Sequence, residues 1–331
     1  MKKFMYALSA TLLSVGILAG CGSESQETNG GEVSEGSGGD YPSKNIQIIV
    51  PYSAGGGGDT VARMIADSLS DELGRQINVV NREGAGGEIG ISEIARSDAD
   101  GYTLGLFGYP DNFILEHTGN TDFSYDSFEY LAAYDDVPHA LFVGPNTEFN
   151  TVEEFIEQAN ANPGSVTVGE SGALGLLKVL AFENEADVDV TPVTYDGGGE
   201  LINALLGGHI DVASSSITAA QQIVDAGGQP LGYAGSERLE LFDEYPTFKE
   251  QGYDLQLGVT RVLVAPAGIP DEVREELVNA LDSLSENEDF QQKFMNATLP
   301  YRYLNHDDLN EYLEQSNETL LPLIENNEGS F

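Results

Sequence analysis

The segment Ile46-Gln-Ile-Ile-Val-Pro-Tyr-Ser-Ala-Gly-Gly-Gly-Gly-Asp-Thr60 combines three features that together predict an α/β unit. A run of apolar residues typical of a buried strand is followed by four glycines and then by the amphipathic run Val61–Leu69. A helix that begins directly after such a loop presents bare backbone N–H groups, and its dipole favours an anion at that end. The segment therefore predicts a loop that binds either a phosphate or a carboxylate.

Strand-like and helix-like segments alternate from this point to the end of the chain. The predicted strands are 46–50, 77–80, 102–107, 130–143 (one strand or two), 166–168, 190–194, 210–214, 230–234 and 259–264. The predicted helices are 59–73, 87–96, 152–161 (with Thr151 as N-cap), 174–184, 200–206, 218–226, 270–287 and 309–326. Such alternation predicts parallel sheets flanked by helices, with ligands beyond the carboxyl ends of the strands.

Four loops rich in small residues follow predicted strands and open predicted helices: Tyr52–Thr60, Gly84–Gly90, Gly169–Gly175 and Tyr195–Gly199. One such loop is weak evidence, because glycine also closes ordinary turns. A phosphate-binding P-loop would need Gly-Lys-Ser/Thr where Gly58-Asp59-Thr60 stands, and the spacing of the second loop misses the dinucleotide fingerprint by one residue. The four loops therefore favour a carboxylate, and no cofactor is expected.

The net charge of −41, from 14 basic and 55 acidic residues, excludes a nucleic-acid-binding role. We interpret this acidity as a surface adapted to high salt or high pH rather than as a partner-binding feature. The four histidines show no metal-ligand spacing, and Ser171 lacks the final glycine of a nucleophile elbow. Without tryptophan, a sugar-stacking glycosidase cleft is also disfavoured. No catalytic residue and no enzyme activity are expected.

The first residues predict export. Met1-Lys2-Lys3 precedes an apolar run from Ala7 to Gly20, which has the length of a signal-peptide core and is too short for a membrane span. Leu18-Ala-Gly-Cys21 has the lipobox pattern of bacterial lipoproteins, so Cys21 is the expected lipidation site. Residues 22–40 are polar and small, as in a flexible tether. We expect an extracytoplasmic protein anchored by lipid to the bacterial cell membrane, at the cell surface or in the periplasm.

Six motifs, two of which overlap the segment quoted first, occur together between Tyr41 and the C-terminus. They are Tyr41-Pro-Ser-Lys-Asn-Ile-Gln-Ile-Ile-Val-Pro51, Gly55–Asp59, Asn81-Arg-Glu-Gly-Ala-Gly-Gly-Glu-Ile-Gly90, Asp100–Leu104, Leu205-Leu-Gly-Gly-His-Ile-Asp211 and Ala265-Pro-Ala-Gly-Ile-Pro270. With these motifs the chain resembles the Bug family, the solute-binding receptors of tripartite tricarboxylate transporters.

This resemblance implies a periplasmic-binding-protein-like Venus flytrap of two α/β domains joined by crossing strands, expected near Ala140–Pro145 and Gly258–Val264. Together with the export signal, this resemblance divides the chain into a signal peptide (1–20), a lipidated tether (21–40), a first domain (41–143 and 261–331) and a second domain (144–260). It also implies a small organic carboxylate, preferably a di- or tricarboxylate, held largely by backbone groups. The expected partners are this ligand and the membrane permease subunits.

The expected ligand-binding residues come from all four loops and one crossing strand. They are Tyr52, Ser53, Ala54, Gly55, Gly56, Asp59, Thr60, Gly84, Gly86, Gly87, Ser171, Gly172, Tyr195, Gly197 and Arg261. Asp59 and Thr60 are expected to cap the helix that follows the first loop.

Several of these positions depart from the family pattern or allow two interpretations. Lys178 stands near the place of a family histidine, and Asp196 replaces a family lysine and would repel an anion if it faced the cleft. Arg261 is either a functional residue, as a clamp for a second carboxylate or a bridge that closes the cleft, or half of an ordinary interdomain ion pair. Arg82 is interpreted as a structural pair beside the second loop. Two rival functions remain: a receptor that signals to a membrane kinase, and a secreted hydrolase.

Overall fold

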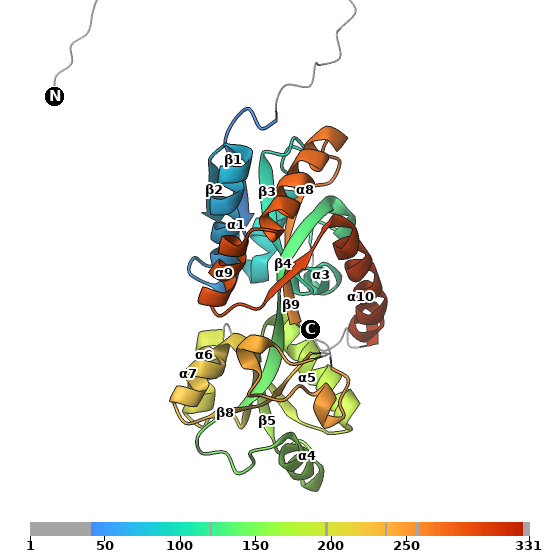
Figure 1. Ribbon diagram of the computed structural model, residues 1–331. Helices are drawn as coiled ribbons and strands as arrows, with labels where there is room; N and C mark the ends of the chain where they lie inside the picture. The colour runs from blue at the N-terminus through green and yellow to red at the C-terminus, as the bar shows by residue number, and fades with distance from the viewer. Residues whose placement is uncertain (1–40, 120, 196–197, 236, 256–257, 327–331) are drawn as a thin grey trace, which may run out of the picture. The chain divides into compact units, whose positions relative to one another are not determined.

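The structure is a computed structural model, and it describes residues 41–119, 121–195, 198–235, 237–255 and 258–326 (Figure 1). The predicted signal peptide, the lipidation site at Cys21 and the tether lie outside these ranges, as do Asp196 and Gly197. Among the described residues, none of the helices is both long enough and apolar enough to span a membrane.

Ten strands form a mixed sheet in which β4 has a central position. Its main path runs in the order β2-β1-β3-β9-β4-β7-β5-β6, and β8 and β10 also pair with β4. The strands are β1 (Ile46–Val50), β2 (Ile77–Asn81), β3 (Thr103–Tyr109), β4 (Phe128–Val143), β5 (Thr167–Ser171), β6 (Thr191–Tyr195), β7 (Val212–Ser216), β8 (Gln229–Tyr233), β9 (Gly258–Pro266) and β10 (Tyr301–Leu304).

The long strand β4 changes partners part-way along its length, as its path in Figure 1 shows. Up to Pro138 it pairs antiparallel with β9 and β10, and from His139 onward it pairs antiparallel with β7 and β8. We call β1, β2, β3, β9, β10 and the beginning of β4 the first strand set, and β5 to β8 with the end of β4 the second strand set. The partner change falls slightly before the expected crossing at Ala140–Pro145.

The prediction of parallel sheets is correct for part of each set only. β1 pairs parallel with β2 and β3, and β5 pairs parallel with β6 and β7. β4 continues from the first set into the second. It is antiparallel to β9 in the first set and to β7 in the second. The fold class, a mixed α/β sheet flanked by helices, is as predicted.

Ten α-helices accompany the strands in the part of the chain that the structure describes. They are α1 (Gly57–Leu73), α2 (Glu88–Ala95), α3 (Asp111–Thr118), α4 (Val152–Ala161), α5 (Gly172–Ala186), α6 (Gly198–Leu206), α7 (Ala220–Asp225), α8 (Asp271–Ser285), α9 (Glu288–Asn296) and α10 (His306–Asn326). Thr151 caps α4 as predicted, because its hydroxyl accepts the N–H of Glu154 at 3.2 Å. The helices α3 and α9 and the strand β10 were not predicted.

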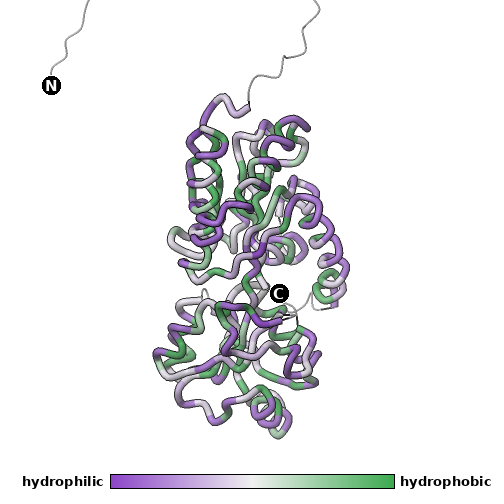
Figure 2. The backbone as a smooth tube through the Cα atoms, viewed as in Figure 1, coloured by the Kyte–Doolittle hydropathy of each residue, from purple (hydrophilic) through white to green (hydrophobic). Residues whose placement is uncertain are grey.

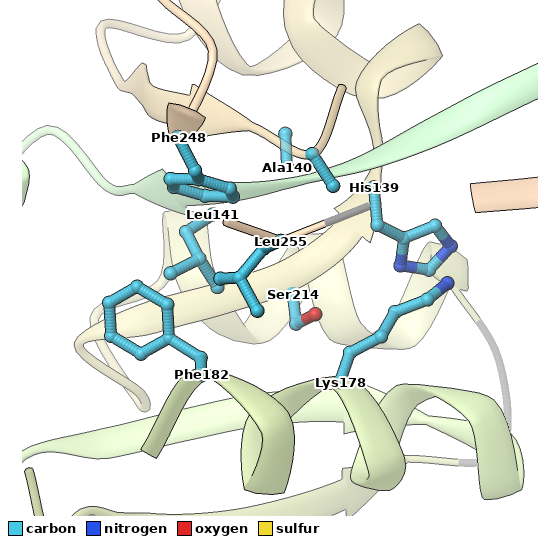
Figure 3. A pocket seen from close by; sticks show the side chains of 9 residues that line it. His139, Ala140, Leu141, Lys178, Phe182, Ser214, Phe248 and Leu255 are labelled. Carbon is cyan, nitrogen blue, oxygen red and sulfur yellow. The ribbon is translucent and has the colours of Figure 1, made fainter. Parts of the chain in front are cut away.

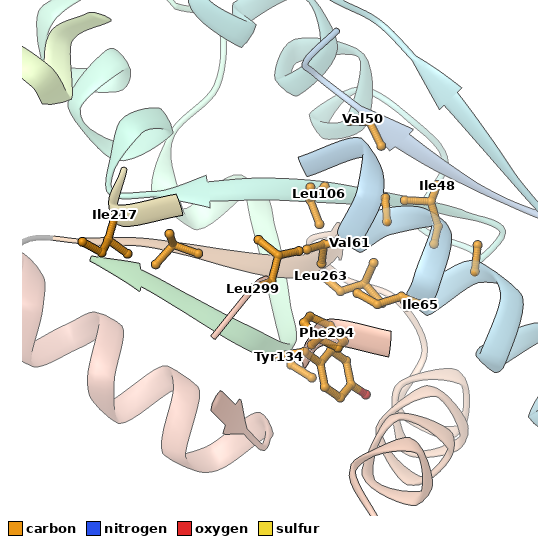
Figure 4. Close-up of a cluster of buried hydrophobic side chains, with 14 of the residues drawn as sticks. Ile48, Val50, Val61, Ile65, Leu106, Tyr134, Ile217, Leu263, Phe294 and Leu299 are labelled. Carbon is orange, nitrogen blue, oxygen red and sulfur yellow. The ribbon is translucent and has the colours of Figure 1, made fainter. Parts of the chain in front are cut away.

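The apolar core of the first strand set lies between α1 and the sheet. Ile65 of α1 packs toward Ile48 of β1 and Leu263 of β9, and the rings of Tyr134 and Phe294 extend this cluster (Figure 4). The second strand set has its own aromatic core, in which Phe155 of α4 stacks on Phe182 of α5. Hydrophobic residues follow the strands, whereas the outer helices α8 and α10 are largely hydrophilic (Figure 2). This burial fixes the strand ends from which the loops of the candidate site emerge.

Candidate functional site

The first glycine loop leads from β1 directly into α1. The helix begins at Gly57, two residues before the predicted start, and its N-cap residue Gly56 supplies no side chain. The first N–H groups of a helix have no partner within the helix, so this end presents donors and the positive end of the helix dipole. Ser53, Ala54 and Gly55 of the loop are exposed, and the Ser53 hydroxyl donates to Glu83 at 2.5 Å.

Asp59 and Thr60 do not cap α1 in the expected way. Asp59 lies in the first turn, where its carboxylate accepts the backbone N–H of Gly55 at 2.8 Å. The Thr60 hydroxyl donates to the carbonyl oxygen of Gly56 at 3.0 Å. The prediction placed both residues at the helix start, and because the helix begins earlier they brace the loop from within the helix.

The buried carboxylate of Asp59 holds the loop through three side-chain and backbone partners. Besides Gly55, it accepts from Arg63 at 2.9 Å and from Asn81 of β2 at 2.9 Å. Asn81 also donates to the carbonyl oxygen of Tyr52 at 3.0 Å. The hydrogen bond from Arg63 is the main reason that the pKa of Asp59 falls to about 2. Asp59 is therefore a structural anchor of the loop and does not face the ligand as an acid.

Replacing Asp59 by asparagine is expected to lower the free energy of unfolding by about 2 kcal/mol at neutral pH. The folded-state pKa lies below the ordinary value, so this stabilisation is complete above about pH 4 and is lost as the pH falls toward 2. Urea unfolding at neutral pH and near pH 3 measures both effects. Asp67→Asn, on the exposed face of α1, is the control and should change stability by less than about 1 kcal/mol. An equal loss for Asp59→Asn at both pH values contradicts the assignment.

Tyr52 lies beneath the loops, where its ring fills the space left by three glycines. A Cβ atom at Gly58 would lie 2.9 Å from the ring, one at Gly87 would lie 3.6 Å from it, and one at Gly108 would overlap the hydroxyl. Burial raises the pKa of the Tyr52 hydroxyl, which donates to Asn112 Oδ1 at 3.0 Å. The expected ligand contact at Tyr52 thus corresponds to a residue that positions the first and second loops against each other.

Asn112 of α3 has a free donor beside the second loop, and sequence reasoning missed it. Its Oδ1 accepts the backbone N–H of Gly108 at 2.8 Å, which fixes the orientation of the amide because a backbone N–H can only donate. The Nδ2 atom is buried without a partner among the described residues. A Cβ atom at Gly87 would lie 3.2 Å from this nitrogen. A buried donor left open in this way is a candidate ligand contact.

The second glycine loop owes its shape to backbone conformations that favour glycine. Gly84, Gly86 and Gly87 have φ angles of 132°, 66° and 105°. Gly87 is the N-cap residue of α2 and donates its N–H to Gly84 at 3.0 Å. Arg82, next to this loop, forms an ion pair with Glu93 at 3.0 Å, which confirms its predicted structural role.

Arg261 lies on β9 and points to the N-terminus of α1. A Cβ atom at Gly57 would lie 2.5 Å from Nη2 of Arg261 and 3.1 Å from its Cζ, so the guanidinium occupies the space above this glycine. The side chain is 14% exposed and forms an ion pair with Asp135, which is fully buried. A β-bulge in β4 between Ala133 and Asp136 turns Asp135 toward β9, where it also accepts the backbone N–H of Arg261 at 3.0 Å.

This arrangement changes both interpretations of Arg261. The ion pair joins two neighbouring strands of the first strand set, so it is not the interdomain pair considered from the sequence. The guanidinium also stands beside the positive end of a helix dipole, which is unfavourable unless an anion lies between them. Asp135 offsets the charge of Arg261 from the strand side, and on the helix side Arg261 has no anionic partner among the described residues.

The predicted contacts from the second strand set lie at the ends of two neighbouring strands. Ser171 ends β5 and pairs in register with Tyr195, which ends β6, and Gly172 begins α5. Gly197 lies outside the described residues. Among the described residues, neither the Ser171 nor the Tyr195 side chain forms a hydrogen bond with the loops of the first strand set. Besides β4, the two sets are connected by α5, which packs against α3 and α10.

Lys178 of α5 and Asp111 of α3 are charged groups in this contact. Burial lowers the pKa of Lys178 to about 7, although the carboxylates of Asp111 and Asp136 oppose the shift. Burial raises the pKa of Asp111, against the effect of Lys178 and Arg261. Lys178 and Arg261, one from each strand set, therefore both act electrostatically on the same half-buried acid.

Comparison with known protein families matches residues 61–328 to the tripartite tricarboxylate transporter family receptor, TctC. The chain belongs to this family. The resemblance drawn from the sequence motifs is thereby confirmed, and the receptor is a solute-binding protein rather than an enzyme. Receptors of this family are extracytoplasmic.

The chain is also similar to a UPF0065 protein of Agrobacterium vitis, from the TAR-I ttuE-ttuC' intergenic region. The two are 31% identical over 256 residues, and the match covers 73% of this chain and 71% of the relative.

Solved structures share the fold of the receptor. A TctC solute-binding protein from Polaromonas without ligand has a TM-score of 0.73 at 26% identity, over 86% of this chain and 99% of that one. The periplasmic binding protein BugD has a TM-score of 0.71 at 27% identity, over 87% and 98%. MatC from Rhodopseudomonas palustris with bound malate has a TM-score of 0.73 over 86% and 100%, and its 22% identity supports the fold alone.

Proposed function

We propose that this receptor captures a small organic carboxylate, preferably a di- or tricarboxylate, and delivers it to the membrane permease subunits of a tripartite transporter. In this proposal Cys21 carries a lipid that anchors the protein outside the cytoplasm. The first domain comprises 41–143 and 261–331, the second comprises 144–260, and the ligand lies between them. Family membership supports the receptor role, and the finer assignments rest on the site itself.

The observation that carries the carboxylate assignment is the position of the Arg261 guanidinium over Gly57. It puts a cation and the N-terminus of α1 against the same space, and a carboxylate can accept from both. Asn112 Nδ2, on the far side of the Tyr52 ring, supplies a further donor from α3. No phosphate-specific motif accompanies these donors, so a carboxylate is the better match.

Calorimetric titration in high salt with citrate, tartrate, malate, succinate, adipate, glutamate and an aromatic acid tests this function. Binding of at least one di- or tricarboxylate is the expected result. If none of these acids binds, the carboxylate assignment is wrong.

Gly57→Ala is expected to weaken carboxylate binding by about tenfold or more, because the new Cβ displaces the Arg261 guanidinium. The free energy of unfolding should fall by less than the full loss of the Arg261–Asp135 ion pair would cost, because Arg261 is still present and alanine is favourable in a helix. Titration of the same carboxylate with wild type and variant measures the effect.

Gly199→Ala, which adds the same methyl group to the first turn of α6, is the matched control for this prediction. A Cβ atom at this position would meet nothing within 4 Å. This variant should bind nearly as wild type does. Equal affinities for Gly57→Ala and Gly199→Ala would remove Arg261 from the binding site.

A further inference from the structure

The ammonium group of Lys178 is buried without a hydrogen-bond partner among the described residues. The residue is 5% exposed and lies on α5, and its side chain extends from the helix toward the strands of the second strand set (Figure 3). Burying a charge without a partner costs free energy, and a ligand of opposite charge would offset that cost. This residue is therefore a candidate for contact with a charged ligand.

The charged and titratable neighbours of Lys178 come from β4 and α3, and they are only partly engaged by other groups. Asp136 of β4 is paired with Arg302, and Asp111 faces Lys178 from α3 without a hydrogen bond between them. His139 of β4 points its ring toward the ammonium group, and its Nδ1 also has no partner among the described residues (Figure 3). Burial, with Lys178 and then Arg261, holds the pKa of His139 well below its usual range.

These relations place Lys178 close to the carboxylate site of the first strand set. Asp111 and His139 each lie within electrostatic range of both Lys178 and Arg261. Asp111 is also the chain neighbour of Asn112, which carries the open Nδ2 donor. A ligand whose first acid group lies at Gly57 and Arg261 therefore has a second cationic group within reach, on the other strand set.

The cavity behind Lys178 is not the site of this second group. It has a volume of about 20 Å³, room for about one water molecule, and apolar side chains line the part of it away from Lys178. Those side chains are Leu141, Phe182, Phe248 and Leu255, which Figure 3 shows away from the ammonium group. The ligand must approach Lys178 from the side of Asp111 and α3.

We propose that Lys178 is the residue that selects ligands with a second acid group, and that it contacts this group as the ammonium ion. The inference rests on the proposed carboxylate-binding function and adds the origin of its charge selectivity. His139, as a neutral imidazole, can donate one N–H to the same acid group. Arg261 and Lys178 then hold the two ends of one ligand from the two strand sets, and the second acid group favours their approach.

Contact with an acid group stabilises the protonated form of Lys178, so a dicarboxylate should enter together with a proton taken from the buffer. In the free receptor this lysine gives up its proton at lower pH than an exposed lysine, because it is buried. Its charged neighbours Asp111 and Asp136 oppose that loss. A monocarboxylate, which reaches only the Arg261 end, should bind without this uptake.

Calorimetry with two matched pairs, succinate with butyrate and adipate with hexanoate, tests the proposal. In wild type each dicarboxylate that binds is expected to bind about tenfold or more tightly than its monocarboxylate partner. Titrations at about pH 8 in phosphate and in Tris, whose ionisation enthalpies differ, should show proton uptake for the dicarboxylate only. Lys178→Met should bring the two affinities to within about threefold and abolish the uptake.

The matched control is Lys249→Met, which removes an exposed lysine of the same strand set and should keep both the preference and the uptake. A dicarboxylate preference that survives in Lys178→Met, or equal binding of both acids by wild type, overturns the role of Lys178 and leaves the carboxylate receptor standing. Failure of wild type to bind any of the four acids or the wider panel overturns both. The proton uptake is measured on wild type, so its absence overturns the proposal even if the variant does not fold.

Discussion

Replacing Arg261 by methionine is expected to weaken carboxylate binding by about a hundredfold or more and to lower the free energy of unfolding by about 3–5 kcal/mol. Binding fails because the guanidinium over Gly57 is the side-chain cation at the N-terminus of α1. Stability falls because Asp135, which is fully buried, loses its counter-charge. Calorimetric titration and urea unfolding measure the two effects separately.

A double variant separates the two roles of Arg261. Asp135→Asn combined with Arg261→Met removes both buried charges and keeps an oxygen that can accept the backbone N–H at position 261. The double variant should recover most of the lost stability, since replacing a buried pair by neutral groups is often nearly neutral. Its carboxylate binding should stay as weak as in Arg261→Met.

Arg274→Met is the control for removing a surface arginine. Arg274 of α8 forms ion pairs with Asp271 and Glu129, and its loss should cost no more than about 1 kcal/mol and leave binding unchanged. Wild-type affinity in the double variant would show that the guanidinium is dispensable for the ligand, and the structural role with Asp135 would be the whole role of Arg261.

Asn112→Asp is expected to weaken carboxylate binding by about a hundredfold while the fold is retained. The aspartate keeps an oxygen for the N–H of Gly108 and the hydroxyl of Tyr52, so the contacts that order the site persist. The change puts an acceptor in the place of Nδ2, the open donor beside Gly87, and its negative charge repels the ligand.

The loss should grow with pH, because a buried carboxyl group that is still protonated can donate in place of the amide. Titrations at about pH 5 and about pH 8 measure this dependence. Asn78→Asp on the exposed face of β2 adds the same charge to the first strand set and should leave the affinity nearly unchanged. An Asn112→Asp variant with wild-type affinity at both pH values would show that Nδ2 does not meet the ligand.

Local patterns predicted the elements that hold the loops. The strand Ile46–Val50 and the helix Val152–Ala161 match the structure in both bounds, because each has a strong pattern with clear turn or cap residues at its ends. The helix α3 escaped notice, although Pro110 followed by Asp111 is a recognised helix-start signal and Phe113 and Ile114 supply the buried face. Missing α3 also meant missing Asn112.

A similar signal marks the start of α9, which the sequence reading left out when it ended the preceding helix at Asn287. That residue is the N-cap of α9, and its side chain accepts the N–H of Phe290 at 3.1 Å. The acidic pair Glu288 and Asp289 occupies the first turn, as at many helix starts. The cap residue and the acidic first turn together mark in the sequence where α8 ends and α9 begins.

The charged part of the site lies beyond the reach of local patterns. Arg261 and Asp135 are far apart in the chain, and their contact depends on strand pairing and on a bulge that no periodicity announces. The approach of Lys178 to Asp111 likewise depends on the packing of α5 against α3. Sequence reasoning could name Arg261 and Lys178 as unusual cations, but their partners follow only from the tertiary structure.

Pro138, the last residue of β4 that pairs with β9, is a position at which the long strand can bend at little cost in hydrogen bonds. Proline has no N–H and its ring fixes φ, so a change of ψ at this residue breaks no hydrogen bond that it would otherwise donate. Its partner in register is Gly258, which has no side chain to obstruct the movement. A continuous strand can thus act as a compliant joint at one residue while the ladders on either side stay intact.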